Sequence, residues 1–238
     1  MKCDYVIMPA AEPDVQPHWL RVVDGQIVQR GRGPNWRHPA EEADNDDVDG
    51  RVLLVLPPHV TTLHWIACPG MTLRQGAAAA RLMALEASIG GTGQLHASAL
   101  ESETSEAPHI VAVASESAMA HWVDWCEDHG VPRASLVPAP LLLPAPDDGF
   151  VRGRVGPSDV VRGRDTAFDG NEPAAPLIMG DAPISQLQLG DIESSLISAL
   201  YEPPLDLRQG VFAPSKARLF DADRLRRLGA LLGLIILV

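Results

Sequence analysis

Three short stretches of this chain have the residue types of a chemical site: a glycine-rich turn, an acidic run and a cysteine–histidine pair. The turn, Gly-Gly-Thr-Gly at residues 90–93, has the composition of a phosphate cradle. It follows a predicted helix, however, whereas phosphate loops precede one, so that free N–H groups and the positive end of the helix dipole face the anion. The sequence therefore favours a helix C-cap and turn here.

The acidic run and the cysteine–histidine pair are both short of metal ligands. A calcium loop closes with Glu at its twelfth position, and counting from Asp44 that position is Val55. A structural zinc site would need two ligands besides Cys126 and His129, and nothing nearby in the sequence offers them. We predict a solvated loop for the run, which consists of Glu41, Glu42, Asp44, Asp46, Asp47 and Asp49.

No catalytic residue, cofactor or metal ligand is predicted. The eight histidines are scattered, so no Ser-His-Asp, Cys-His or paired-carboxylate arrangement can be asserted from sequence. Gly180-Asp181 and Gly190-Asp191 have the character of a turn and a helix N-cap. The sequence Val-Arg-Gly-Arg occurs at residues 151–154 and again at 161–164. This repeat predicts a hairpin with outward arginines, for which anion binding is the alternative to a solubilising strand face.

Charge and cysteine content restrict the function classes. The net charge is −12, and residues 216–238 hold five cations against two acids, so the preceding body carries −15. This balance argues against nucleic acid and against broad contact with anionic lipid. Three widely spaced cysteines indicate a reducing compartment. A charge follows Met1 before any apolar run, so we expect no signal peptide.

The end of the chain predicts a membrane anchor. A basic cluster leads directly into an apolar run at residues 228–238 that has about half of the ~20 residues that a membrane span needs. We interpret the run as the start of a transmembrane helix with residues 1–227 in the cytoplasm, and a helix packed in the protein core is the alternative. The basic residues are Lys216, Arg218, Arg224, Arg226 and Arg227, and the predicted anchor residues are Leu228, Leu231, Leu232, Leu234, Ile235, Ile236, Leu237 and Val238.

Between residues 3 and 137 the pattern predicts a mixed α/β fold that begins antiparallel. Strands are expected at 3–8, 19–28 (a hairpin turning at Asp24-Gly25), 51–56 and 60–66. Thr72 and Gln75 form a capping-box pair, and the helix that follows has an apolar stripe of Ala78, Leu82, Leu85 and Ile89. A strand at 109–114, a helix at 115–129 with core-facing Trp122 and Trp125, and a strand at 135–137 form a crossover between parallel neighbours.

The remaining elements are a helix at 192–201 with Asp191 as N-cap and a connector at 205–220. We expect a first lobe at residues 1–100, a second at 101–204, a juxtamembrane connector at 205–227 and the start of the span at 228–238.

Four segments together resemble one family. Residues 205–214 read Leu-Asp-Leu-Arg-Gln-Gly-Val-Phe-Ala-Pro and precede a charged stretch and an apolar run. The others are Cys68-Pro69-Gly70 with a helix and then Leu95-His96-Ala97, the stretch 131–144 with Leu136-Val137-Pro138, and Val161-Arg162-Gly163. In this order they resemble motifs of type II secretion system protein L.

That resemblance implies an actin-like, ribonuclease-H-related cytoplasmic domain of two lobes, a single span of the bacterial inner membrane and a periplasmic ferredoxin-like domain. It implies a non-catalytic scaffold that recruits the secretion ATPase, protein E, couples it to protein M and other platform proteins, and forms a homodimer. Actin-like nucleotide sites place a glycine-containing phosphate hairpin at the first strand, whereas here Asp4 is followed by Tyr5, Val6, Ile7 and Met8. The alternatives are an actin-like nucleotide-binding enzyme and the inner-membrane assembly protein of type IV pili.

Overall fold

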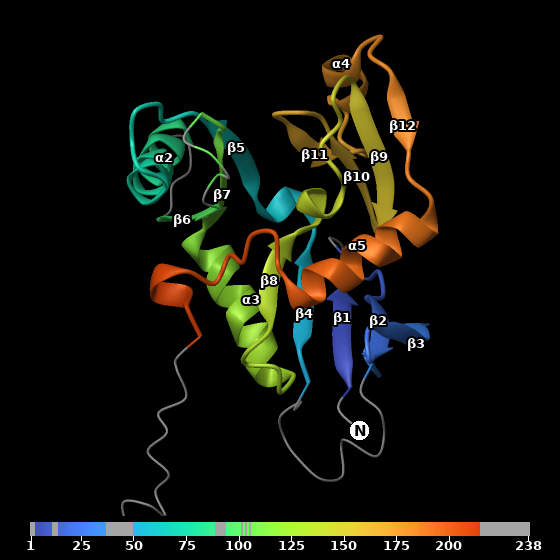
Figure 1. Cartoon of the computed structure of the whole chain (residues 1–238). Helices are drawn as coiled ribbons and strands as arrows, with labels where there is room; N and C mark the ends of the chain where they lie inside the picture. The colour runs from blue at the N-terminus through green and yellow to red at the C-terminus, as the bar shows by residue number, and fades with distance from the viewer. Residues whose placement is uncertain are drawn as a thin grey trace, which may run out of the picture.

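The computed structural model describes residues 3–10, 14–36, 50–88, 94–100, 102, 104 and 106–214. In these ranges the chain forms three β-sheets with helices packed against them (Figure 1). The mixed α/β class predicted from the sequence is confirmed.

The largest sheet has five strands, four from the first 56 residues and one from much later in the chain. Its order is β3 (Gln26–Arg32), β2 (His18–Val23), β1 (Asp4–Met8), β4 (Val52–Leu56) and β8 (Ser135–Pro138). The first three strands pair antiparallel, and β1, β4 and β8 run parallel. The predicted hairpin is confirmed, with positive φ angles of 48° at Asp24 and 75° at Gly25, which this type of turn requires.

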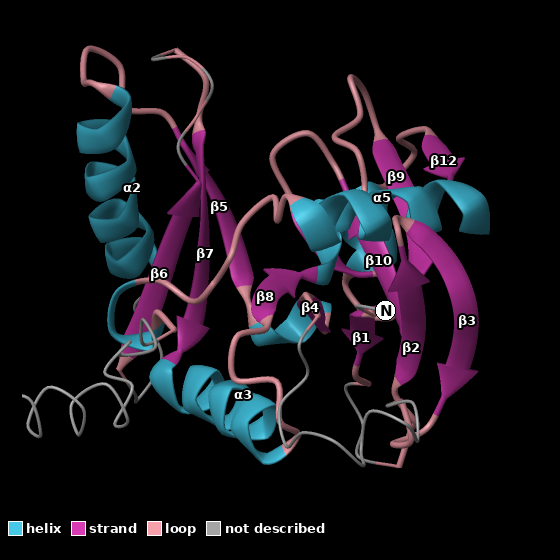
Figure 2. Cartoon of the chain, turned by 60° about the horizontal axis from the view of Figure 1, so that its bottom comes forward, coloured by secondary structure: helices cyan, strands magenta, loops and turns pink. Residues whose placement is uncertain are grey.

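The second sheet is antiparallel, and helix α2 (Leu73–Ala87) lies along it (Figure 2). Its strands are β5 (Thr62–Ile66), β7 (His109–Ser115) and β6 (Leu95–Leu100), with the short helix η1 (Pro58–Val60) before β5. The predicted capping box is present at the start of α2.

The apolar stripe predicted for this helix is wrong at Ala78 and Leu82, which are exposed; Leu85 is partly buried against the core, and Ile89 lies outside the described residues. Leu82 is 64% exposed, and the buried positions are Gly76, Ala77, Ala80 and Ala84. Small side chains let the helix backbone approach the sheet: a Cβ at Gly76 would lie 2.3 Å from Nε2 of His109. Close approach, rather than the bulk of leucine, determines which face is buried.

Helix α3 (Glu116–Asp128) has Ser115 as its N-cap, and it connects two different sheets. The predicted parallel pairing of the strands on either side of it is wrong. Both edges of β7 are occupied by the antiparallel neighbours β5 and β6, so the chain passes along α3 to β8, which pairs with β4. Met119 and Cys126 are the fully buried residues of α3, while the predicted core residues Trp122 and Trp125 are only partly buried.

The third sheet contains the predicted arginine hairpin. Its order is β11 (Ala167–Asp169), β10 (Ser158–Arg162), β9 (Phe150–Val155) and β12 (Ile184–Gln186), with helix α4 (Ala175–Met179) beside it. The expectation that all its arginines point outward is wrong for Arg162. That side chain is 9% exposed, and its Nη1 donates to the carbonyl oxygens of Leu141 and Leu143 around η2 (Ala139–Leu142). The guanidinium thus satisfies backbone acceptors where the chain leaves the five-stranded sheet.

Helices cover both faces of the five-stranded sheet (Figure 1). On one face Tyr5, Ile7 and Leu54 pack with residues of α3. On the other, Val6 and Leu53 pack with α5 (Leu189–Tyr201). This alternation follows from the two-residue period of a strand. Asp191 lies in the first turn of α5 instead of at the predicted N-cap, which is Gln188.

Residues 205–212, here called the C-terminal segment, were predicted as part of a connector. In the structure Leu205 and Leu207 are 1% and 0% exposed and belong to the same core as Tyr5. The N–H of Leu207 donates to Leu136 O of β8 at 2.8 Å, and its carbonyl accepts from Nε2 of His96 and Oγ of Ser98, both at 2.9 Å. The segment ends in the short helix η3 (Gly210–Phe212). It therefore joins the five-stranded sheet to the three-stranded sheet.

Several sequence predictions concern residues outside the described ranges. The glycine-rich turn at 90–93, the acidic run at 41–49, the basic cluster and the apolar run at 228–238 lie outside the described residues. The division of the chain at residues 100 and 101 stays a prediction; β8 lies in the same sheet as strands from before that boundary.

Within the ranges given above, no helix has the length and apolar character needed to cross a membrane.

Candidate functional site

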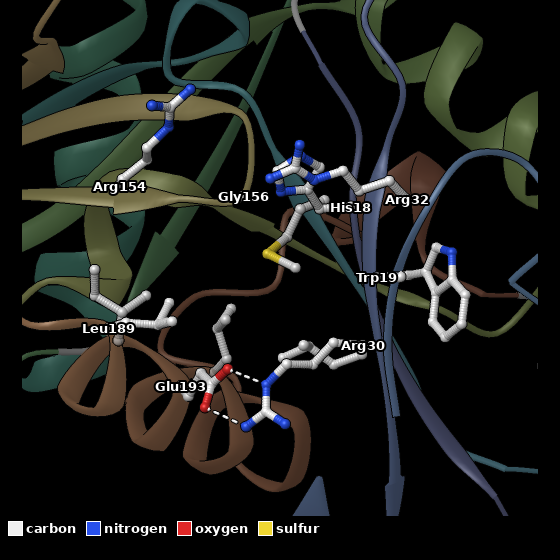
Figure 3. Close-up of a pocket in the computed structure, with 13 residues that line it drawn as sticks. His18, Trp19, Arg30, Arg32, Arg154, Gly156, Leu189 and Glu193 are labelled. Carbon is white, nitrogen blue, oxygen red and sulfur yellow. Dashed lines mark hydrogen bonds and ion pairs between the residues drawn. The ribbon is translucent and has the colours of Figure 1, made fainter. Parts of the chain in front are cut away.

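A cavity of about 730 Å³ lies between the β2–β3 hairpin, the turn after β9 and helix α5 (Figure 3). Its basic side chains come from two different sheets: the cations Arg30 and Arg32 on β3 and Arg154 on β9, and the imidazole of His18 on β2. One carboxylate, that of Glu193, faces them from α5. This pocket is the candidate functional site.

The strand geometry places two arginines on the same side of the hairpin. Arg30 and Arg32 are two residues apart on β3, so their side chains leave the same face of the strand. The intervening Gly31 pairs with Trp19 of β2, and a Cβ there would lie 2.0 Å from the indole ring. Glycine at this position lets the indole cover the strand, while the arginines on either side of it remain exposed.

Arg30 connects the hairpin to α5. Its Nε and Nη2 donate to the two carboxylate oxygens of Glu193 at 2.6 and 2.7 Å (Figure 3). This paired geometry matches the planar guanidinium to the planar carboxylate. The bond to Arg30 lowers the pKa of Glu193 and raises that of Arg30, so both groups are charged at neutral pH.

The other cations of the pocket have no such partner. In the part of the chain that the structure describes, neither Arg32 nor Arg154 has a carboxylate within ion-pair distance. Burial lowers the pKa of His18, and the positive charges of Arg32 and Arg154 lower it further. The imidazole is therefore neutral at pH 7, and it lies in the positive field of the two guanidinium groups.

The turn that presents Arg154 is closely packed. Gly156 has a φ of 59°, and a Cβ there would lie 2.6 Å from Cβ of Met8. Apolar side chains from three elements, Met8, Leu20, Ile192 and Leu196, line the inner surface. Leu189 lies at the rim and is 66% exposed. The pocket thus combines an apolar inner surface with cationic walls, a lining suited to a ligand that has both anionic and apolar groups.

The residues that the sequence offered as candidate chemical sites have roles in packing or in helix ends. Burial raises the pKa of the Cys126 thiol to about 12, and Nδ1 of His129 lies 2.7 Å from Trp125 O while its ring stacks on that indole. Among the described residues, no group of three or more His, Cys, Asp and Glu side chains could hold a metal ion. Gly180 ends α4, and Asp191 lies in the first turn of α5.

Comparison with known proteins identifies the family of this chain. The family described as "Type II secretion system (T2SS), protein L" matches residues 6–185, which is most of the chain. The chain belongs to that family. The resemblance predicted from the four sequence segments is confirmed.

Two known proteins are similar to this chain. Type II secretion system protein L of Dickeya chrysanthemi is 28% identical over 151 residues, which cover 63% of this chain and 37% of that relative's length. The solved cytoplasmic domain of EpsL, an inner membrane component of the type II secretion system of Vibrio cholerae, matches 89% of this chain and all of that structure. Its TM-score is 0.65 at 15% identity, a likeness of fold. The predicted actin-like class is thereby confirmed.

Sequence reasoning missed the arginine pocket of this family member. The signal that was available is Arg30-Gly31-Arg32, two cations with one face of a strand in common and a glycine between them. The pairing of Arg30 with Glu193, 163 residues later, has no local signature. The position of Arg154, which reaches the pocket from a different sheet, has no local signature either.

Proposed function

We propose that this chain is a non-catalytic component of the inner-membrane platform of a type II secretion system. In this role it recruits the cytoplasmic secretion ATPase, protein E, and couples it to membrane partners that include protein M. The observation that carries the proposal is the family match over residues 6–185.

The first strand supports a non-catalytic role. Tyr5, Val6, Ile7 and Met8 form one continuous strand, and each is at most 4% exposed. Residues 9–17, which lead to β2, contain no glycine, serine or threonine, the residue types with which such hairpins approach and bind phosphates. The Asp4 carboxylate accepts the N–H of Arg51 at 2.7 Å and the hydroxyl of Tyr201 at 3.2 Å, so both of its oxygens are bound within the fold.

Nucleotide binding is tested by calorimetry with ATP and magnesium. We expect no binding tighter than about millimolar, a level at which affinity is worth only ~4 kcal/mol. Micromolar binding or turnover would contradict the non-catalytic proposal and favour an actin-like enzyme.

The membrane part of the proposal rests on the sequence. Residues 228–238 would begin a single-pass anchor, and the cations between Lys216 and Arg227 would keep residues 1–227 on the cytoplasmic side. A reporter fused after a completed span is expected in the periplasm, and one fused after Ala213 in the cytoplasm. The opposite pattern would overturn the topology.

Recruitment is tested by retaining protein E on the immobilised 238-residue chain in neutral detergent. Protein E from the same system is expected to be retained, whereas protein E from an unrelated system is the specificity control. Light scattering of the free chain in the same detergent, without protein E, tests the homodimer, whose protein mass should be twice the chain mass. A chain that does not retain its own protein E would contradict the recruitment proposal.

A further inference from the structure

The arginine pocket has a positive charge that is unusual for this molecule. The chain as a whole carries −12. Three guanidinium groups nevertheless meet at one cavity, where Glu193 is the single facing carboxylate among the described residues, and Arg30 already binds it. Like charges placed together weaken a fold unless something compensates them, and an anionic ligand would provide that compensation.

The bond between Arg30 and Glu193 shows which ligand chemistry the pocket accepts. A carboxylate is bound there through both oxygens. Arg32 and Arg154 are exposed guanidinium groups on neighbouring walls of the same cavity, and each can bind a carboxylate in the same way. The rim favours more than a small ion, because a bare anion would leave Leu189, which is 66% exposed, in contact with water.

The position of β3 favours an extended segment of a protein. This strand ends the five-stranded sheet, and its only strand partner in the described part of the chain is β2 (Figure 1). Its outer backbone groups can therefore pair with an added strand, in which alternate side chains would face the pocket. Cationic walls, an apolar inner surface and an open strand edge occur together at this one place on the described chain.

We infer that the arginine pocket binds an acidic segment of a partner protein, in which carboxylates alternate with apolar residues, through Arg32 and Arg154. The inference deepens the proposed function. It rests on that function in one respect, because it takes the partner to be a protein of the secretion platform. The carboxylates bind the two guanidinium groups, and the apolar residues pack against Leu189 at the rim of the pocket.

The probe is a fluorescent peptide of nine residues in which Glu and Leu alternate, with a matched Gln–Leu peptide as control. Its binding to the 238-residue chain in neutral detergent is followed by fluorescence anisotropy. We expect the Glu peptide to bind at least about tenfold tighter than the Gln peptide, and to weaken as salt rises from about 0.05 to about 0.3 M. Equal affinity for both peptides would overturn the inference.

Three variants locate the binding. The double variant Arg32→Ala/Arg154→Ala should weaken the Glu peptide about tenfold or more, while Arg164→Ala, an exposed arginine outside the pocket, should leave affinity unchanged. Arg32→Lys/Arg154→Lys keeps the charge without the forked geometry and should fall between them. Unchanged affinity in the double alanine variant, with its melting temperature also unchanged, would overturn the inference.

Two other occupants are outcomes of the same titration. If about 10 mM inorganic phosphate displaces the Glu peptide completely, and free glutamate binds as tightly as that peptide, the pocket is a simple anion site and the inference is wrong. The chain's own acidic run at 41–49 is tested by changing its six acids to amides. Peptide binding that occurs only in that amide variant would assign the pocket to the run and likewise overturn the inference.

Retention of protein E separates this inference from the proposed function. If the wild type and the double alanine variant retain protein E equally, and the peptide result also fails, recruitment stands and the pocket assignment falls. If the peptide binds as expected but the wild type does not retain protein E, the pocket assignment stands and the recruitment proposal falls.

Discussion

The C-terminal segment and the arginine pocket both contain polar groups, and these groups have hydrogen-bond or ion-pair partners to very different degrees. In the segment, Leu207 and Gln209 form hydrogen bonds of at most 3.4 Å with partners in two sheets and with Arg81 of α2. In the pocket, Arg32 and Arg154 are exposed and have no carboxylate partner among the described residues. Satisfied, buried polar groups hold a fold together, whereas cations gathered without partners are available to a ligand.

The largest expected effect is in the C-terminal segment. Leu207→Ala removes a fully buried side chain and should lower the free energy of unfolding by ~2 to 5 kcal/mol, measured by chemical denaturation. The matched control is Val211→Ala in the same segment, where the side chain is 83% exposed and a change within about 0.5 kcal/mol is expected. Equal effects of the two substitutions would contradict the structural role of the segment.

The next effect tests the polar contacts of the segment. Gln209→Ala leaves Nη2 of Arg81 and the backbone of Ala99 without their partner, which should cost ~1 to 3 kcal/mol. A double-mutant cycle with Arg81→Ala should give a coupling energy well above zero, because the two side chains meet at 2.6 Å. Additive effects would mean that this contact contributes nothing to stability.

The pocket should respond in the opposite way. Arg32→Ala/Arg154→Ala is expected to change the free energy of unfolding by no more than about 0.5 kcal/mol, since neither side chain has an ion-pair partner in the described ranges. A thermal melt beside that of Gln209→Ala makes the comparison directly. Strong destabilisation by the double substitution would remove the distinction between the two regions.

The smallest effect is electrostatic and concerns His18. Because Arg32 and Arg154 help burial to lower its pKa, the double alanine variant should raise that pKa toward its ordinary value, as measured by NMR titration. The lowered folded pKa means that the unfolded chain binds the proton more readily. The neutral His18 therefore stabilises the folded state above pH 6.5, and this stabilisation is lost as the pH falls from 6.5 through the lowered folded pKa. An unchanged titration would show that the guanidinium groups do not act on the imidazole.

Sequence patterns predicted local structure well and the contacts between distant segments poorly. The Asp24-Gly25 turn, the Thr72 capping box and the helix at 116–128 have short signals, and all three are present. The pairing of β8 with β4 and the burial of Arg162 depend on contacts far apart in the sequence, for which one chain gives no signal.

Burial was the other weak point of the sequence predictions. The sequence favoured leucine and tryptophan faces, whereas α2 packs through alanine and glycine and α3 through Met119 and Cys126. Trp122 is partly exposed, so Trp122→Ala is expected to cost less than the ~3 to 5 kcal/mol of a fully buried aromatic residue.

The burial of the C-terminal segment has a consequence for biosynthesis. Leu205 and Leu207 share one core with Tyr5, so residues from the start of the chain and from its last described stretch complete the same cluster. A nascent chain emerges from the ribosome N-terminus first, and until residue 207 has emerged this core lacks part of its wall and leaves apolar surface exposed. We therefore expect the five-stranded sheet to expose apolar surface to chaperones until residue 207 has left the ribosome.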